Sequence, residues 1–188
     1  MSSTDDQDVY TADVAARYLD FYGHGQDAFE SLLVFNAAMA MRGNGRLLDV
    51  GCGPGIIHDW VNIPYGDYVG IDPSAAMIAE ARRRWPKYTY HHVRFEDYQP
   101  MGEFDVVLGA FGPLMHVHDL RQFAFRLSRC LKPDGRFLLM AAGQPHQHVR
   151  LLDGKSPETI YHSTGELRDA FGGHVYPLGS LLVVTNVG

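Results

Sequence analysis

The sequence predicts an α/β protein with a doubly wound, mostly parallel sheet. Short apolar runs that suit buried strands alternate along the chain with segments of helical periodicity, and this alternation is typical of that fold class. Glycines at positions 51, 53 and 55 follow the first of these runs, as in turns that bind nucleotides. Since 188 residues with 46% hydrophobic and 20% charged side chains suit one globular core, we expect a single domain, 1–188.

Two helices are expected ahead of the glycine turn. Apolar residues recur at helical spacing over 11–22 and again over 27–41. Gly43-Asn44-Gly45 should end the second helix, because glycine commonly caps the C-terminus of a helix. The spacing places on one side of the second helix Phe29, Leu32, Leu33, Asn36, Ala37 and Ala40.

The glycine turn lies in the stretch LLDVGCGPG, residues 47–55. Its apolar start is expected to be a buried strand, and the glycines that follow let a ligand lie against the backbone because they carry no Cβ. Residues 56–61 are expected to begin a helix whose first amides are unpaired and partly positive. Strand, turn and helix start together predict a nucleotide-type pocket.

The details of the turn disfavour the phosphate-containing nucleotides. A dinucleotide fold would need a small residue where Ile56 stands, and a P-loop would need Gly-Lys-Ser/Thr, which is absent. Asp49 ends the strand and faces the turn, where its charge would repel a pyrophosphate. It would attract the cationic amino acid part of S-adenosylmethionine, which has no phosphate. An NAD-dependent reductase is therefore the less favoured alternative.

This stretch resembles motif I of the class I S-adenosylmethionine-dependent methyltransferases. VGIDPSAAMIAEAR, at 69–82, resembles their motif II, and FDVV followed by LMHV resembles motif IV. The resemblance covers about 45–187. It implies a strand order of 3-2-1-4-5-7-6 with the last strand antiparallel, S-adenosylmethionine as cofactor and S-adenosylhomocysteine as product. It also implies that 1–44 forms a helical cap over a core formed by 45–188.

Asp72 is the second candidate carboxylate. It ends the next buried strand, 21 positions after Gly51, near the spacing at which nucleotide folds place an acid on the ribose hydroxyls. Alternatively Asp72 caps the helix over 75–84, but Ser74 can take that role. The resemblance implies that Asp72 binds ribose and that Met77 packs near the adenine.

The adenine amine needs an acceptor after the third strand, 88–93. The family commonly places an acid or amide there beside an apolar residue, here Phe95, and the sequence does not choose between Glu96 and Asp97. Both could equally be solvated loop acids. In full, the cofactor-binding residues are expected to be Asp49, Gly51, Cys52, Gly53, Gly55, Asp72, Pro73, Met77, Phe95, Glu96, Asp97, Gly109, Ala110 and Phe111.

The acceptor side of the site is expected in the loop after the fourth strand, 104–111. His116 lies nearest the transferred methyl in that loop, so it is the candidate general base, which is needed only if the acceptor loses a proton. Alternatively it is a wall of the pocket, and the N-terminal tyrosines are core anchors. The substrate pocket is expected to contain Tyr10, Tyr18, Tyr22, Phe111, His116 and His146.

Four histidines raise the question of a metal. His116 and His118, with His146 and His148, form two H-x-H pairs, but zinc sites usually have tighter ligand sets, so no metal is expected.

The C-terminal part of the chain contains a helix-start signal, because Ser163 and Glu166 form a capping box. The remaining elements are expected to be a helix over 119–131, a turn over 131–136, a strand over 137–142, a loop over 144–162, a helix ending at 171, and an antiparallel pair over 174–177 and 181–187.

Charge and composition limit the classes of binding partner. A formal charge of −6 and a pI near 5.9 disfavour nucleic acid. No apolar run reaches the length of a membrane span, the start is unlike a signal peptide, and the two cysteines are far apart. We expect a cytoplasmic monomer or homodimer that methylates O or N of a small molecule. The alternative is a methyltransferase-like protein that binds S-adenosylmethionine without methyl transfer.

Overall fold

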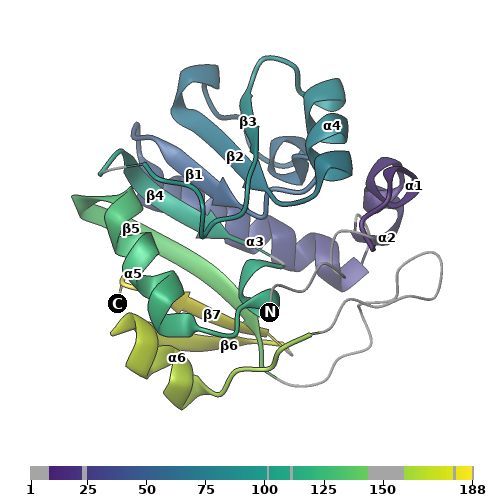
Figure 1. Ribbon diagram of the computed structural model, residues 1–188. Coiled ribbons are helices and arrows are strands. Elements are labelled where there is room, and N and C mark those ends of the chain that lie inside the picture. Colours follow the sequence, from purple (N-terminus) through teal and green to yellow (C-terminus); the bar gives the residue numbers. More distant parts are fainter. Residues whose placement is uncertain are drawn as a thin grey trace.

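A seven-stranded sheet organises the chain (Figure 1). The computed structural model describes residues 9–22, 25–100, 102–110, 112–143, 159–179 and 181–187. The strand order is β3-β2-β1-β4-β5-β7-β6, as predicted. The strands are β1 (Leu47–Val50), β2 (Tyr68–Asp72), β3 (Thr89–His92), β4 (Phe104–Gly109), β5 (Leu131–Ala142), β6 (His174–Leu178) and β7 (Leu181–Thr185).

The strand directions also agree with the prediction. β1 pairs in parallel with β2 and β4, β2 with β3, and β4 with β5, whereas β7 is antiparallel to both β5 and β6. The helices are α1 (Ala12–Ala16), α2 (Tyr18–Tyr22), α3 (Gly25–Arg42), α4 (Ala75–Arg84), α5 (Leu120–Cys130) and α6 (Thr164–Phe171), with short 3-10 helices η2 (Ile56–Asp59), η3 (Tyr65–Asp67) and η4 (Pro113–His116).

Helices cover both faces of the sheet (Figure 1). Successive strand residues point to opposite faces, so Leu47 packs in one apolar core and Leu48 in the other. The first core contains residues of α3 and α4, and the second contains residues of α5 and α6. Both faces are buried at the centre of the sheet, which explains why β1, β2 and β4 are mostly apolar.

α3 buries a different side from the one predicted. Val34, Phe35 and Ala38 lie in the first core, whereas Phe29 is 60% exposed and Leu32 and Leu33 are about two fifths exposed. Both sets have helical spacing, because α3 is apolar around most of its circumference. Periodicity therefore predicts the helix, but the sheet selects which side of it is buried.

The crossover from β1 to β2 contains no α-helix in the part of the chain that the structure describes, contrary to the expectation for 56–61. Two short 3-10 helices, η2 and η3, occupy it. Gly55 precedes η2 and offers no capping side chain. Pro64 follows soon after, and proline both lacks an amide donor and restricts the residue before it to extended conformations. Too few residues remain between them for a stable helix.

Two further boundaries differ from the sequence-based expectation. The helix predicted over 11–22 is divided at Arg17 into α1 and α2. The turn predicted over 131–136 lies within β5 as a bulge, because Leu131 pairs with Phe104 and Arg136 with Val106. The capping box of Ser163 and Glu166 is confirmed. Among the described helices, none is long and apolar enough to cross a membrane.

Candidate functional site

A cavity of about 290 Å³ opens at the carboxyl ends of the central strands, above the glycine turn. This is the edge at which doubly wound sheets bind their ligands. The cavity is lined from several separate segments: the residues just before α1, the start of α2, the glycine turn, the start of α4, the loop after β3, and η4. Of the predicted residues, it brings together Tyr10, Tyr18, Asp49, Gly51, Cys52, Gly53, Asp72, Pro73, Met77, Phe95, Glu96, Ala110 and His116.

The glycine turn has the conformation that its sequence requires. Gly51, Gly53 and Gly55 have φ values of 68°, 53° and 76°, in the left-handed region that residues with a Cβ rarely adopt. The amides of Gly51 and Cys52 donate to the Ile71 carbonyl at 2.8 and 3.1 Å, which ties the turn to β2. A Cβ on Gly53 would meet no atom within 4 Å. The backbone at Gly53 is therefore open to a ligand.

Asp72 connects the glycine turn to the start of α4. Its Oδ2 accepts from the Gly53 amide at 2.9 Å and its Oδ1 accepts from the Ser74 amide at 2.8 Å. Ser74 is the N-cap of α4, since its hydroxyl accepts from the Met77 amide, as predicted. Asp72 is thus engaged with the backbone, yet an ionised carboxylate has about four lone-pair sites. Two lone-pair sites therefore remain for a ligand.

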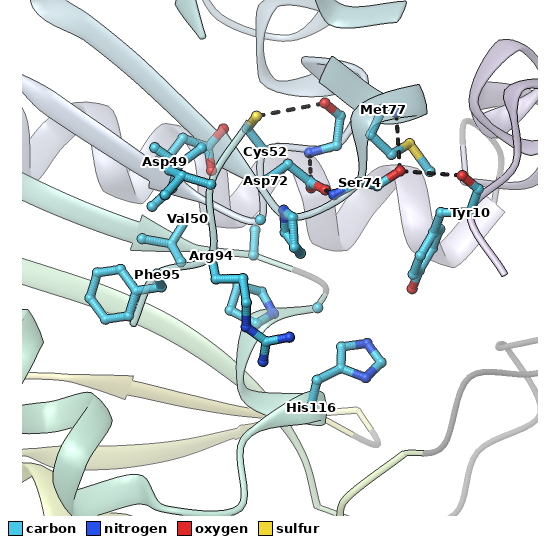
Figure 2. A pocket seen from close by; sticks show the side chains of 18 of the residues that line it. Tyr10, Asp49, Val50, Cys52, Asp72, Ser74, Met77, Arg94, Phe95 and His116 are labelled. Atoms are coloured by element: carbon cyan, nitrogen blue, oxygen red, sulfur yellow. Dashed lines mark hydrogen bonds between the residues drawn. The ribbon is translucent and has the colours of Figure 1, made fainter. Parts of the chain in front are cut away.

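Asp49 lines the same cavity from the end of β1. It is 4% exposed, and its Oδ2 accepts a hydrogen bond of 2.9 Å from the Tyr68 hydroxyl. Figure 2 shows Asp49 on one side of the glycine turn and Asp72 beside Cys52 on the other. Two buried carboxylates next to accessible backbone form a site suited to a ligand with a cation and a diol.

Burial changes the protonation of both carboxylates. It raises the pKa of Asp49 to about 7, opposed by the hydrogen bond from Tyr68 and reinforced by the charge of Asp72. It raises the pKa of Asp72 to about 6, against the hydrogen bonds from the Ser74 and Gly53 amides and the charge of His92. Both values exceed the ordinary 3.8. The stability that these groups contribute to the unliganded protein is therefore complete below about pH 4 and is lost as the pH rises through 6 and 7.

Ligand binding should show the opposite pH dependence. A cationic ligand favours ionised Asp49, so we expect the affinity for S-adenosylmethionine to increase as the pH rises through about 7. Calorimetric titration across this range, in buffers of different ionisation enthalpy, should show proton release below pH 7. Asp49→Asn should remove most of the dependence. An affinity that stays constant with pH in the wild type would contradict a role for Asp49 in binding the cation.

One side of the cavity is formed by η4, which two contacts hold in place. The Nε2 of His162 donates to the Leu114 carbonyl at 2.8 Å, and the Ile160 amide donates to the Met115 carbonyl at 2.8 Å. Figure 2 shows His116 across the cavity from Asp72 and Ser74, with Arg94 extending between them. His116 therefore faces the space between the cofactor residues and the opening.

Some predicted residues do not line the cavity. Gly55 faces Trp85 and Tyr90, and Gly109 faces Leu139, while Asp97 is also absent from the lining, which favours Glu96 as the adenine partner. Phe111 and His146 lie outside the described residues, as does the side chain of Tyr22. Lining residues that the sequence analysis did not assign to the site include Phe35, Ser74, Arg94 and Phe123.

Arg94 is the most informative of these additions. Its Nε lies 3.5 Å from Oε2 of Glu96, and both side chains are partly exposed in the cavity. A glutamate can accept from an adenine amine, whereas an arginine can only donate. The loop after β3 thus offers one donor and one acceptor. No local signal identified Arg94, because a basic loop residue is ordinary on a protein surface.

A metal site was not expected. Within the described ranges, His, Cys, Asp and Glu form no group of three or more that could hold an ion. His146 and His148, one of the two H-x-H pairs, lie outside those ranges.

The fold and the cavity define the class of protein. The strand order is the one expected from the resemblance to the class I S-adenosylmethionine-dependent methyltransferases, and the glycine turn and the carboxylates after β1 and β2 line one cavity. Residues 47–135 match the family described as "Methyltransferase domain". The predicted class is therefore confirmed, and with it S-adenosylmethionine as the cofactor of the class.

Curated relatives match about half of the chain. A "Ubiquinone biosynthesis O-methyltransferase" of Rhodopseudomonas palustris (strain TIE-1) is 36% identical over 94 residues, which are 48% of this chain and 37% of that protein. This chain thus spans well under two thirds of the length of that relative. The acceptor therefore has to be argued from the cavity.

Solved structures share the fold over nearly the whole chain. A methyltransferase of Thermotoga maritima, described as a possible histamine N-methyltransferase, has a TM-score of 0.70 at 17% identity and covers 95% of this chain and 97% of its own. The DhpI complex with S-adenosylhomocysteine has a TM-score of 0.66 at 23% identity, covering 95% and 93%. At these identities the likeness shows the fold.

Proposed function

We propose that this protein transfers the methyl group of S-adenosylmethionine to an oxygen or nitrogen of a small molecule. The observation that supports it most is the open backbone at Gly53 beside two buried carboxylates, in a cavity that His116 also lines. Asp49 suits the ammonium group, Asp72 the ribose hydroxyls and Glu96 the adenine amine. The volume of about 290 Å³ is at the lower end of the roughly 300–1,000 Å³ of small-molecule pockets.

The residues would act mainly by positioning. S-adenosylmethionine, when bound, supplies a methyl group already activated by the sulfonium. Asp49 and Asp72 would fix its two ends, and η4 with Tyr10 and Tyr18 would hold the acceptor close to the methyl, a proximity that supplies much of the rate. A hydroxyl or ammonium acceptor must also lose a proton. His116, the last residue of η4, is the candidate base that would accept it.

We expect His116→Ala to lower kcat by about 100-fold, the usual contribution of a general base, with the affinity for S-adenosylmethionine unchanged. The matched control is His118→Ala, which removes a second imidazole that lines the cavity and should change kcat only a few fold. Steady-state rates of S-adenosylhomocysteine formation measure both. Equal, small effects of the two substitutions would make His116 a pocket wall.

We further propose that 1–188 is one domain in which the segment 1–44 supplies a cap through α1. Val14 and Ala15 of α1 pack on Met77, and the Ser74 hydroxyl donates to the Tyr10 carbonyl at 3.2 Å. α3, in the same segment, packs on the sheet instead.

We also propose a cytoplasmic location and a monomeric or homodimeric state. The buried free thiols of Cys52 and Cys130 suit the cytoplasm. Cell fractionation tests the location, and analytical ultracentrifugation tests the oligomeric state.

The function is tested in two steps. Calorimetric titration with S-adenosylmethionine, S-adenosylhomocysteine and NADH should show micromolar binding of the first two and none of NADH. A panel of small phenols, amines and carboxylates should then yield S-adenosylhomocysteine with a subset of acceptors. Binding without turnover on any acceptor would favour the alternative, a binding module. Failure of both adenosyl ligands would mean that the cavity has been misassigned.

A further inference from the structure

A cluster of buried polar side chains lies beneath the glycine turn, on the face of the sheet that α3 and α4 cover. Tyr68, at the start of β2, is 1% exposed, and its hydroxyl donates 2.9 Å to Oδ2 of Asp49. Asp49 pairs with Gly70, two residues beyond Tyr68, so both side chains lie on one face of adjacent strands. This hydrogen bond therefore crosses directly from one strand to the next.

Gly70 leaves the space that the contact needs. A Cβ at Gly70 would lie 2.8 Å from the Tyr68 hydroxyl oxygen and 2.9 Å from Sγ of Cys52. Any larger residue would displace the Tyr68 hydroxyl from its position next to Asp49. The sequence Tyr68-Val69-Gly70 is thus suited to bringing a phenol to a carboxylate of the cofactor site.

We propose that Tyr68 is a positioning residue for cofactor binding: its hydroxyl orients the Asp49 carboxylate and favours the charged form that receives the ammonium group. The proposal rests on the assignment of Asp49 to the cofactor under the proposed function. One carboxylate oxygen is held by the protein in this arrangement. The other is left for the ligand.

The surroundings of Asp49 make such a donor necessary. Asp72 faces it with a negative charge, and burial keeps the Cys52 thiol and the Tyr90 hydroxyl neutral by raising the pKa of each. Burial itself disfavours a charged Asp49, and the hydrogen bond from Tyr68 opposes that effect on its pKa. Without the hydroxyl, the pKa of Asp49 would rise further, and less of it would be ionised near neutral pH.

Tyr68→Phe isolates the hydroxyl. The ring contacts with His58 at 4.4 Å and Tyr90 at 5.8 Å remain available to phenylalanine. We expect the Kd for S-adenosylhomocysteine at pH 7 to increase about 10-fold, as for a lost hydrogen bond to a charged group. Binding of 5′-methylthioadenosine, which has the adenosine but no ammonium group, should not change. The midpoint of the rise in S-adenosylhomocysteine affinity with pH should lie at a higher pH in Tyr68→Phe than in the wild type.

Tyr90→Phe is the matched control. It removes a neighbouring buried hydroxyl that has no hydrogen-bond partner among the described residues, so neither ligand should bind differently. In the Asp49→Asn background, Tyr68→Phe should cause no additional loss, because the hydroxyl acts through Asp49. This comparison is made at one temperature below the melting of every variant, so it remains valid if Tyr68→Phe lowers stability.

Three results would overturn the proposal. Equal weakening of both ligands by Tyr68→Phe would make Tyr68 merely structural, and no change in either would remove its role. An additional loss in the Asp49→Asn background would show that it acts by another route. If the proposed methyl transfer itself fails, the wild type will bind S-adenosylhomocysteine without turnover, a result separate from all three.

Discussion

Gly53→Val should abolish detectable binding of S-adenosylmethionine while the fold stays intact. Gly53 has a φ of 53°, and a Cβ there would meet no atom within 4 Å, although the residue lines the cavity. The valine side chain would therefore occupy ligand space and would not clash with the protein. We expect an affinity loss of at least about 100-fold, or about 2.8 kcal/mol at 1.4 kcal/mol per tenfold, in calorimetric titration.

Gly43→Val provides a control with the same backbone cost. Gly43 follows α3, has a φ of 55°, and a Cβ there would also meet no atom within 4 Å. A β-branched residue in this conformation is strained by about 1–3 kcal/mol at either site, so both variants should melt at similarly lowered temperatures. Only Gly53→Val should lose the ligand. Normal binding by that variant would place the cofactor elsewhere.

The parts of the site that could be predicted are those in which one short segment contains both the conformation and the chemistry. The glycines themselves allow the positive φ values of the turn. Asp72 follows the turn at a spacing set by the length of the segment that connects β1 to β2 and of β2 itself. The Ser74 cap and the capping box of Ser163 and Glu166 involve neighbours three residues apart. Local sequence determines each of these, and the structure confirms their local geometry.

The errors arise where tertiary contacts decide between locally equivalent solutions. The apolar side chains of α3 suit two opposite sides of the helix, and packing on β4 and β5 selects the side with Val34 and Phe35. The segment after Gly55 has apolar residues enough for a helix. Its length before Pro64 and the packing of Ile57 in the first core give a 3-10 turn instead.

Contacts between strands are the hardest to predict from the sequence. Tyr68 is indistinguishable from a core aromatic residue until the register of β1 with β2 places it beside Asp49. Arg94 likewise enters the cavity only because β3 lies next to β2 and ends at the same edge. Such residues modify a site whose position the motifs already define. Substitutions at them should therefore alter affinity and pH dependence more than the fold.

Asp72→Ala should weaken S-adenosylmethionine binding by about 1.5–3 kcal/mol, the contribution of a hydrogen bond to a charged group, which is about 10- to 150-fold. The loss combines the missing ribose acceptor with the release of the Gly53 amide, which Asp72 holds at 2.9 Å. The matched control is Asp97→Ala, which removes a nearby carboxylate outside the cavity lining. Calorimetric titration of both variants should show normal affinity in the control alone.

The same variant has a second readout that does not involve the ligand. Because burial raises the pKa of Asp72 to about 6, its stabilising contribution to the unliganded protein is lost as the pH rises from about 4 through 6. Asp72→Ala should flatten that part of the pH profile of the free energy of unfolding. Both results together would show that Asp72 lowers the stability of the unliganded protein near neutral pH but is needed for binding. Unchanged affinity together with a flattened profile would show instead that Asp72 only shapes the turn.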